Sequence, residues 1–255
     1  DSTAIGGTLC DINKVEPMPA LKISPPSVSI KFEANTSPLV GKEGDFVTAS
    51  QLQKRLDQEK ENNATLEIKP GDGSAYIVAG RGELQLSILI ETLRREGYEF
   101  QVRKPEVILK NIDGKLHEPL ETVFIEVPNE YLSAVTQEMS NRKATMIDMR
   151  SIGGQTKFEY DLLTRSLFGL RNALITATKG NLVFSSAFKE YVPKQADVNI
   201  FRQGVILSTD NGEAKAYALN MIQERGTLFV QPSEPIYEGM IIGINKYEDD
   251  MEANP

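Results

Sequence analysis

The chain has 255 residues, of which 40% are hydrophobic and 25% charged, as is ordinary for a globular protein of two or more domains. Its net charge of −8 argues against a general nucleic-acid binder, because neutralising phosphates needs clustered Lys and Arg, and its single cysteine, Cys10, excludes an internal disulfide and suits a reducing compartment. No apolar run approaches the ~20 residues of a membrane helix, and no signal segment opens the chain, so we expect a cytoplasmic protein without membrane contact.

Residues 1–24 are predicted to be the remnant of a preceding β-barrel domain and its linker. Residues 4–11 have the pattern of a last strand, and the consecutive prolines Pro25 and Pro26 stop regular pairing after it. The first residue is Asp1, and the sequence pattern predicts neither a helix nor a closing strand in residues 248–255. We therefore expect the sequence to be a piece of a longer protein.

Residues 25–112 carry the pattern of a βαββαβ unit. The expected elements are a strand at 28–32, a helix opened by the capping box of Thr48 and Gln51, strands at 64–68 and 75–79, a helix at 82–96 and a strand at 99–103. Apolar residues at i, i+3, i+4 and i+7 mark one face of the second helix, and Gly97 suits its C-terminal end. This order predicts a split βαβ, or ferredoxin-like, plait.

Residues 113–194 repeat this pattern with little sequence identity. The expected elements are a strand at 122–127, a helix at 130–142, a hairpin of residues 144–150 and 156–162 around Gly153-Gly154, a helix at 166–178 and a strand at 182–191. The spacing of about 85 residues is too long for a solenoid repeat. We therefore predict a second plait.

Residues 195–255 differ from both plaits. Short strands are expected at 198–207, 214–221, 226–230 and 236–244, separated by glycine turns. They indicate part of a β-rich, barrel-like domain. The predicted fold class is thus α+β, with two tandem ferredoxin-like βαββαβ plaits followed by a partial β-rich domain.

The sequence offers no catalytic constellation. No Gly-x-x-x-x-Gly-Lys-Ser/Thr spacing occurs, and the turn Gly80-Arg-Gly82 has Gln85 where a dinucleotide motif needs its third glycine. The single histidine, His117, has no neighbouring Cys or His that would complete a metal site. We expect no catalytic residue, cofactor or metal in this sequence. An enzyme remains open only as an unrecognised site in a cleft between domains.

Positive charge gathers in three stretches that could bind RNA phosphates. Arg is favoured there because its planar guanidinium meets phosphate with two hydrogen bonds. The alternative for each stretch is a solvated face neutralised by nearby Asp or Glu. The candidate RNA-binding residues are Arg94, Arg95, Arg103, Lys104, Arg142, Lys143, Arg165, Arg171 and Lys179.

Several sequence blocks in the same order carry a family resemblance. They are residues 35–48 (NTSPLVGKEGDFVT), 80–106 (GRGELQLSILIETLRREGYEFQVRKPE), 164–171 (TRSLFGLR), 223–229 (QERGTLF) and 237–243 (YEGMIIG). Together they resemble the TypA/BipA branch of the ribosome-associated translational GTPases. Two residues depart from the family pattern: Gln85 replaces a usual His, and Ser166 a usual Gly.

The resemblance implies a function for the chain. The plaits would be the counterparts of the third and fifth domains of elongation factor G, and residues 195–255 would begin the family-specific C-terminal domain. The partner would be the ribosome, through rRNA and ribosomal proteins, in stress adaptation, ribosome assembly and translational control. GTP and magnesium would bind in an N-terminal domain outside this sequence, and the chain itself would be a non-catalytic monomer.

Two other functions stay open. The net charge of −8 favours a protein–protein interaction scaffold without RNA binding. The other is the tail of an elongation-factor-G-like protein that moves tRNA. The blocks at 223–229 and 237–243 argue against this tail, because they resemble the TypA/BipA C-terminal domain.

Overall fold

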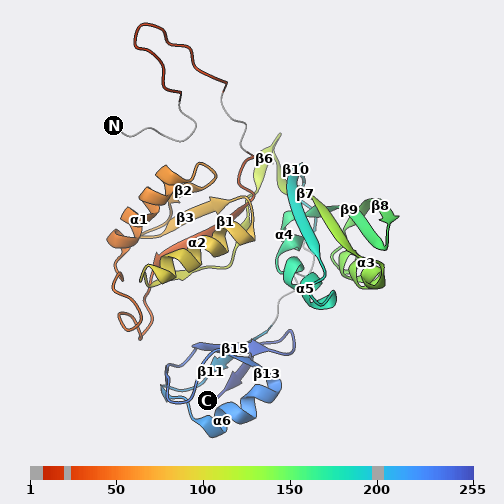
Figure 1. Ribbon diagram of the computed structural model, residues 1–255. Helices are drawn as coiled ribbons and strands as arrows, with labels where there is room; N and C mark the ends of the chain where they lie inside the picture. The colour runs from red at the N-terminus through yellow and green to blue at the C-terminus, as the bar shows by residue number, and fades with distance from the viewer. Residues whose placement is uncertain (1–7, 20–23, 197–203) are drawn as a thin grey trace. The chain divides into compact units, whose positions relative to one another are not determined.

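The computed structural model describes residues 8–19, 24–196 and 204–255 (Figure 1). The chain divides into two compact units, one of residues 1–36 with 40–196 and one of residues 37–39 with 197–255. Most of the strand expected at 4–11 lies outside the described residues. The described stretch 8–19 holds a tight turn, in which the Lys14 amide donates to the Asp11 carbonyl.

The first unit opens with a plait. Its elements are β1 (Val28–Ala34), α1 (Ala49–Asn62), β2 (Glu67–Pro70), β3 (Tyr76–Gly80), α2 (Glu83–Arg95) and β4 (Phe100–Val102). The sheet order is β2-β3-β1-β4 with antiparallel pairing throughout, and a short β5 (Glu106–Val107) extends the pairing along β1. This connectivity is the predicted split βαβ arrangement.

Alternation along β1 and the helical period of α2 build the core of this plait. Val28, Ile30 and Phe32 are buried at every second position of β1, while α2 buries Leu86, Leu89 and Leu93. α1 adds Leu52 and Leu56 to the same cluster. The capping box predicted at Thr48 opens α1, since the Thr48 side chain accepts from the Gln51 amide and the Gln51 side chain from the Thr48 amide.

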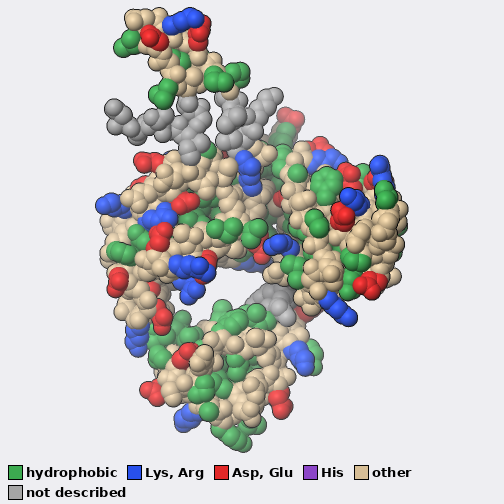
Figure 2. Space-filling model, viewed as in Figure 1, with side chains coloured by type: hydrophobic (Ala, Val, Ile, Leu, Met, Phe, Trp, Pro, Cys, Tyr) green, Lys and Arg blue, Asp and Glu red, His purple; other side chains and the backbone are tan. Residues whose placement is uncertain are grey.

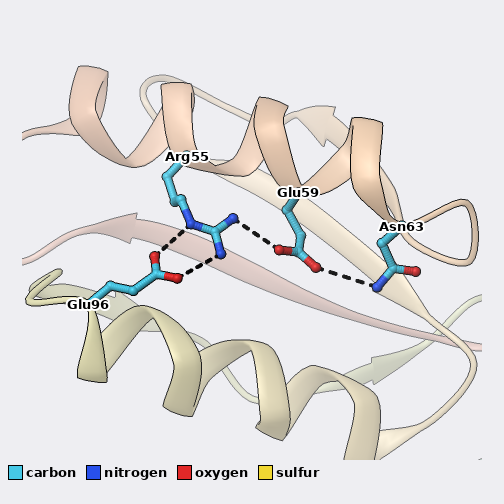
Figure 3. A network of polar contacts seen from close by, with 4 residues as sticks. All are labelled: Arg55, Glu59, Asn63 and Glu96. Atoms are coloured by element: carbon cyan, nitrogen blue, oxygen red, sulfur yellow. Dashed lines mark hydrogen bonds and ion pairs between the residues drawn. The ribbon is translucent and has the colours of Figure 1, made fainter. Parts of the chain in front are cut away.

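A charged network joins the two helices on their solvent side (Figure 3). Arg55 of α1 meets Glu96 at the end of α2 with two bonds, Nε–Oε2 at 2.6 Å and Nη2–Oε1 at 3.0 Å. Its Nη1 also lies 2.9 Å from Glu59, which accepts from Asn63 at 3.4 Å. Bidentate pairing of this kind fixes the spacing of the two helices as well as their charge balance.

The second plait follows within the same unit. Its elements are β7 (Lys115–Pro128), a 3-10 turn (Asn129–Tyr131), α3 (Leu132–Asn141), β8 (Thr145–Ile152), β9 (Gln155–Leu163), α4 (Thr164–Leu167), α5 (Leu170–Ala177) and β10 (Val183–Pro193). The order β10-β7-β9-β8 repeats that of the first plait, and β6 (Lys110–Ile112) pairs with the start of β7. His117 lies in strand β7.

The predicted helix at 166–178 is interrupted. Phe168 is extended with ψ 124°, and Gly169 has a left-handed φ of 68°, which separates α4 from α5. The break is held from outside, because Arg142 donates to the carbonyls of Ser166 and Phe168 that a continuous helix would use internally. Apolar periodicity across the break misled the sequence prediction.

The second unit is smaller and partly helical. Its elements are β11 (Val205–Ser208), β12 (Gly212–Glu213), α6 (Ala216–Ile222), a 3-10 turn (Gln223–Arg225), β13 (Gly226–Leu228), β14 (Pro235–Ile236), β15 (Ile241–Asn245) and β16 (Met251–Ala253). Four strands form a sheet in the order β13-β15-β11-β16, and the strands that the structure describes do not close into a barrel.

The strand predicted at 214–221 is wrong, because this stretch forms α6. Alanine is the best helix former, and Ala216 and Ala218 lie in α6, which buries Leu219 and Ile222 one turn apart on one face. The α+β class with two tandem plaits is confirmed. Across the described ranges, no helix is long and apolar enough to cross a membrane.

Candidate nucleic-acid interface

The acidity of the chain is unevenly distributed. Residues 195–255 carry ten acidic and four basic side chains, whereas residues 25–194 carry 23 acidic and 22 basic. Figure 2 shows both signs interspersed over the first unit. The plaits therefore have almost no negative surplus, and local groups of cations decide whether a phosphate backbone can bind there.

Arg94 and Arg95 form an exposed pair in the last turn of α2, with side chains 70% and 76% exposed. Both bind Glu91, at 2.9 Å and 2.7 Å, and these two guanidinium groups lower the pKa of its carboxyl to about 2. The two arginines and Glu91 together carry one net positive charge. The partial negative charge at the C-terminus of α2 offsets part of it. A phosphate would have to compete with Glu91 for these donors.

Arg103 and Lys104 do not continue that pair. They follow β4, whereas Arg94 and Arg95 precede it, so a three-residue strand of about 10 Å separates the two pairs. Arg103 lies 3.6 Å from Glu33, and the Lys104 side chain is exposed. These four candidate residues, which are neighbours in the sequence, are therefore two separate positive sites.

Two predicted contact residues are buried. Arg142 is 5% exposed; its Nε binds Glu138 at 2.7 Å, and its Nη1 donates to the carbonyls of Ser166 and Phe168 at 2.7 and 2.8 Å. Arg165 is 7% exposed and binds Glu118, itself 1% exposed, at 2.8 Å. These guanidinium groups serve the interior of the plait, and their burial does not suit phosphate contact. Arg142 and Arg165 are therefore excluded from the candidate RNA-binding surface.

The other predicted contact residues of the second plait are exposed, but they are spread over the plait. Lys143 and Lys179 follow α3 and α5 with left-handed φ values of 57° and 52°. Because β7 and β9 are antiparallel, the helices after them run in opposite directions, which places Lys143 and Lys179 at opposite ends of the plait. Arg171 lies near the start of α5. Sequence proximity alone could not reveal this separation.

A hollow of about 540 Å³ opens where the two plaits meet. The first plait contributes Val28 and the first turn of α2, and the second contributes the α4–α5 connection, Arg171 and part of β10. Two carboxylates line it, and both are engaged: Glu83 accepts from the Gly169 amide at 3.1 Å, and Glu121 from the Thr164 hydroxyl at 3.0 Å. The enzyme alternative therefore finds no free acid–base pair in this hollow.

Within the described ranges, no group of three or more His, Cys, Asp and Glu side chains converges as a metal site would. The expectation of no cofactor in this stretch stays a prediction.

Comparison with known proteins identifies the family. Residues 203–255 match the family model described as "TypA/BipA C-terminal domain", and residues 115–200 match "Elongation factor G C-terminus". The chain is 41% identical over 253 residues to "Large ribosomal subunit assembly factor BipA" of Bacillus subtilis (strain 168), covering 98% of this chain and 41% of that protein. The chain belongs to the TypA/BipA family.

Other relatives extend the comparison. A protein of the same name from Escherichia coli (strain K12) is 40% identical over 98% of this chain and 42% of its own length. A "Putative elongation factor TypA-like SVR3, chloroplastic" of Arabidopsis thaliana is 38% identical over 100% of this chain and 38% of its length. The chain thus spans about two fifths of the relatives it matches.

The first TypA/BipA block, residues 35–48, forms a backbone cradle for one carboxylate. The amides of Gly41, Glu43 and Gly44 donate to Glu99 at 2.7, 2.7 and 2.9 Å, and Asn35 adds a side-chain bond at 3.3 Å. The bond from Gly41 is the largest cause that lowers the pKa of Glu99. Sequence reasoning missed this role because Glu99 lies more than fifty residues from the cradle.

Of the two departures from the TypA/BipA pattern, the structure explains Gln85 by its side-chain contacts but gives no explanation for Ser166. Gln85 accepts from the Arg81 amide at 2.9 Å and donates to the Thr65 hydroxyl, which ties the turn before α2 to the connection between α1 and β2. Ser166 offers its backbone carbonyl to Arg142, a contact that any residue could make. Neither departure disturbs the plaits.

Proposed function

We propose that this chain is the ribosome-docking part of a TypA/BipA-type translational GTPase that acts in large-subunit assembly, stress adaptation and translational control. The observation that carries the proposal is the 41% identity, over 98% of the chain, to a relative named as a large ribosomal subunit assembly factor. In this proposal GTP and magnesium bind elsewhere in the longer protein, and the chain supplies contacts with rRNA and ribosomal proteins.

The exposed cations of the plaits are the proposed RNA contacts. They are Arg94, Arg95, Arg103, Lys104, Lys143, Arg171 and Lys179. Side chains of this kind position a protein on a folded RNA through phosphate oxygens, without reading its sequence. Because they are dispersed, each contributes a modest share of affinity, and binding should weaken steeply with salt.

Co-sedimentation with purified ribosomes tests this surface. The variant Arg94→Gln/Arg95→Gln removes two cations without adding a carboxylate beside Glu91, and glutamine keeps a good helix propensity. The matched control, Lys54→Gln/Lys60→Gln, makes the same charge change on exposed positions of α1, outside the proposed contacts.

We expect the Arg94/Arg95 variant to sediment less with ribosomes than the parent at low salt and to show a shallower salt dependence, because it releases fewer counterions. The control should match the parent. Equal loss in both variants would mean that total charge alone matters, and no loss in either would remove Arg94 and Arg95 from the interface.

A protein-binding scaffold without RNA contact is the second candidate. The observation that favours it is the acidity of residues 195–255, which also expose large apolar side chains such as Tyr217, Phe229 and Tyr247. Such a surface suits a basic protein. In the same assay, binding to protein-stripped rRNA favours the RNA proposal, whereas binding to ribosomal proteins alone favours the scaffold.

We further propose that the chain is monomeric and cytoplasmic. The net charge of −8 supports a monomer, because like charges keep copies of the chain apart, and relatives named as ribosomal subunit assembly factors support a cytoplasmic location. Light scattering coupled to size exclusion measures the mass in solution, and a mass near twice 28.3 kDa would contradict the monomer.

A further inference from the structure

Phe168 belongs to one plait by sequence and to the other by packing. It lies between α4 and α5 of the second plait, yet its ring packs against the hydrophobic core of the first, the cluster that contains Phe32, Leu86 and Leu89. Its neighbour Leu167 packs against the core of its own plait. Adjacent residues of one connection therefore serve two different cores.

This connection is fixed from both sides. On the second plait, the buried Arg142 donates to the carbonyls of Ser166 and Phe168. On the first plait, Glu83 at the start of α2 accepts from the amide of Gly169 at 3.1 Å. Gly169 has a left-handed φ of 68°, which glycine adopts without steric cost and which turns the chain into α5 just after this bond.

Other contacts between the plaits lie near this connection, where α4 contacts β5. The buried Ser27, just before β1, lies 3.5 Å from Glu121 of β7, which also accepts from Thr164. Beside these bonds the interface opens into the hollow of about 540 Å³. The hollow leaves part of the interface unpacked, so the contacts at its edge contribute to the coupling of the plaits.

We propose that residues 166–169 form a latch that couples the two plaits. Phe168 is its apolar anchor, Glu83 accepts the hydrogen bond from its Gly169 amide, and Arg142 positions it. Seated, the latch holds the plaits as one body. Released, it leaves them free to move about residues 108–109, the connection between β5 of the first sheet and β6 of the second. The proposal goes beyond ribosome docking and does not rest on it.

Distance measurement between spin labels tests the latch without a ribosome. With Cys10 replaced by Ser, the exposed residues Gln58 of α1 and Gln137 of α3 become the labelled cysteines, one in each plait. Double electron–electron resonance then reports the spread of distances between the plaits. Phe168→Ala removes the anchor, and Leu167→Ala is the matched control one residue away.

We expect the parent to give one narrow distance peak, Phe168→Ala to lose it in favour of a broad distribution, and Leu167→Ala to keep it. Glu83→Ala changes an exposed side chain that the fold does not need, so it should broaden the peak even if Phe168→Ala fails to fold. A broad distribution in the parent, or a peak unchanged by both Phe168→Ala and Glu83→Ala, would overturn the latch.

Discussion

At the scale of single residues, the arginines of this chain show that charge in a sequence does not identify a binding surface. Arg94 and Arg142 each lie near a helix C-terminus and each pair with a glutamate one turn earlier. Arg94 faces solvent, whereas Arg142 is buried and supports two carbonyls of another segment. The two arginines differ in the contacts that Arg142 makes with the distant residues Ser166 and Phe168. These contacts cannot be read from the sequence around either arginine.

This difference predicts opposite effects on stability. Arg142→Ala leaves two carbonyls and Glu138 without their donor, which should lower the free energy of unfolding by about 3 kcal/mol. Arg94→Ala should leave the unfolding midpoint almost unchanged, because exposed ion pairs contribute little. Urea denaturation followed by circular dichroism measures both, and equal midpoints for the two variants would contradict the structural role of Arg142.

At the scale of elements, most strands and helices of the plaits follow from local pattern. Alternation in β1, the capping box of Thr48 and the apolar face of α2 predict their elements because burial on one face decides them. The break between α4 and α5 could not be predicted, since Arg142 and the first plait impose it through contacts distant in sequence. In α6, helix propensity and a buried face outweighed the glycine-rich surroundings that suggested strands.

The cradle of residues 41–44 gives a pH prediction at this scale. The cradle amides lower the pKa of Glu99 in the folded state, so its stabilising effect is complete above the unfolded pKa of about 4.3 and disappears as pH falls through the folded value. We expect Glu99→Gln to be less stable than the parent at pH 7 and the two to converge in acid. Thermal unfolding between pH 7 and pH 3 measures this difference, and a constant difference over that range would contradict the role of the carboxylate.

At the scale of the whole molecule, charge is segregated along the chain. Residues 25–194 are nearly balanced, and most of the net −8 belongs to residues 195–255. The family, the fold class and the absence of a nucleotide motif could be argued from sequence, because they depend on ordered motifs. The candidate interface could not, because exposure and the positions of cations at opposite ends of a plait depend on the folded arrangement.

The measurement that tests the central claim most directly is sedimentation of this chain with purified large and small ribosomal subunits across a salt series. Relatives named as large-subunit assembly factors, and exposed cations on both plaits, predict binding to the large subunit that weakens as salt rises. Absence of binding to the large subunit at low salt would contradict ribosome docking by this part of the protein, and equal binding to both subunits would contradict its preference for the large subunit.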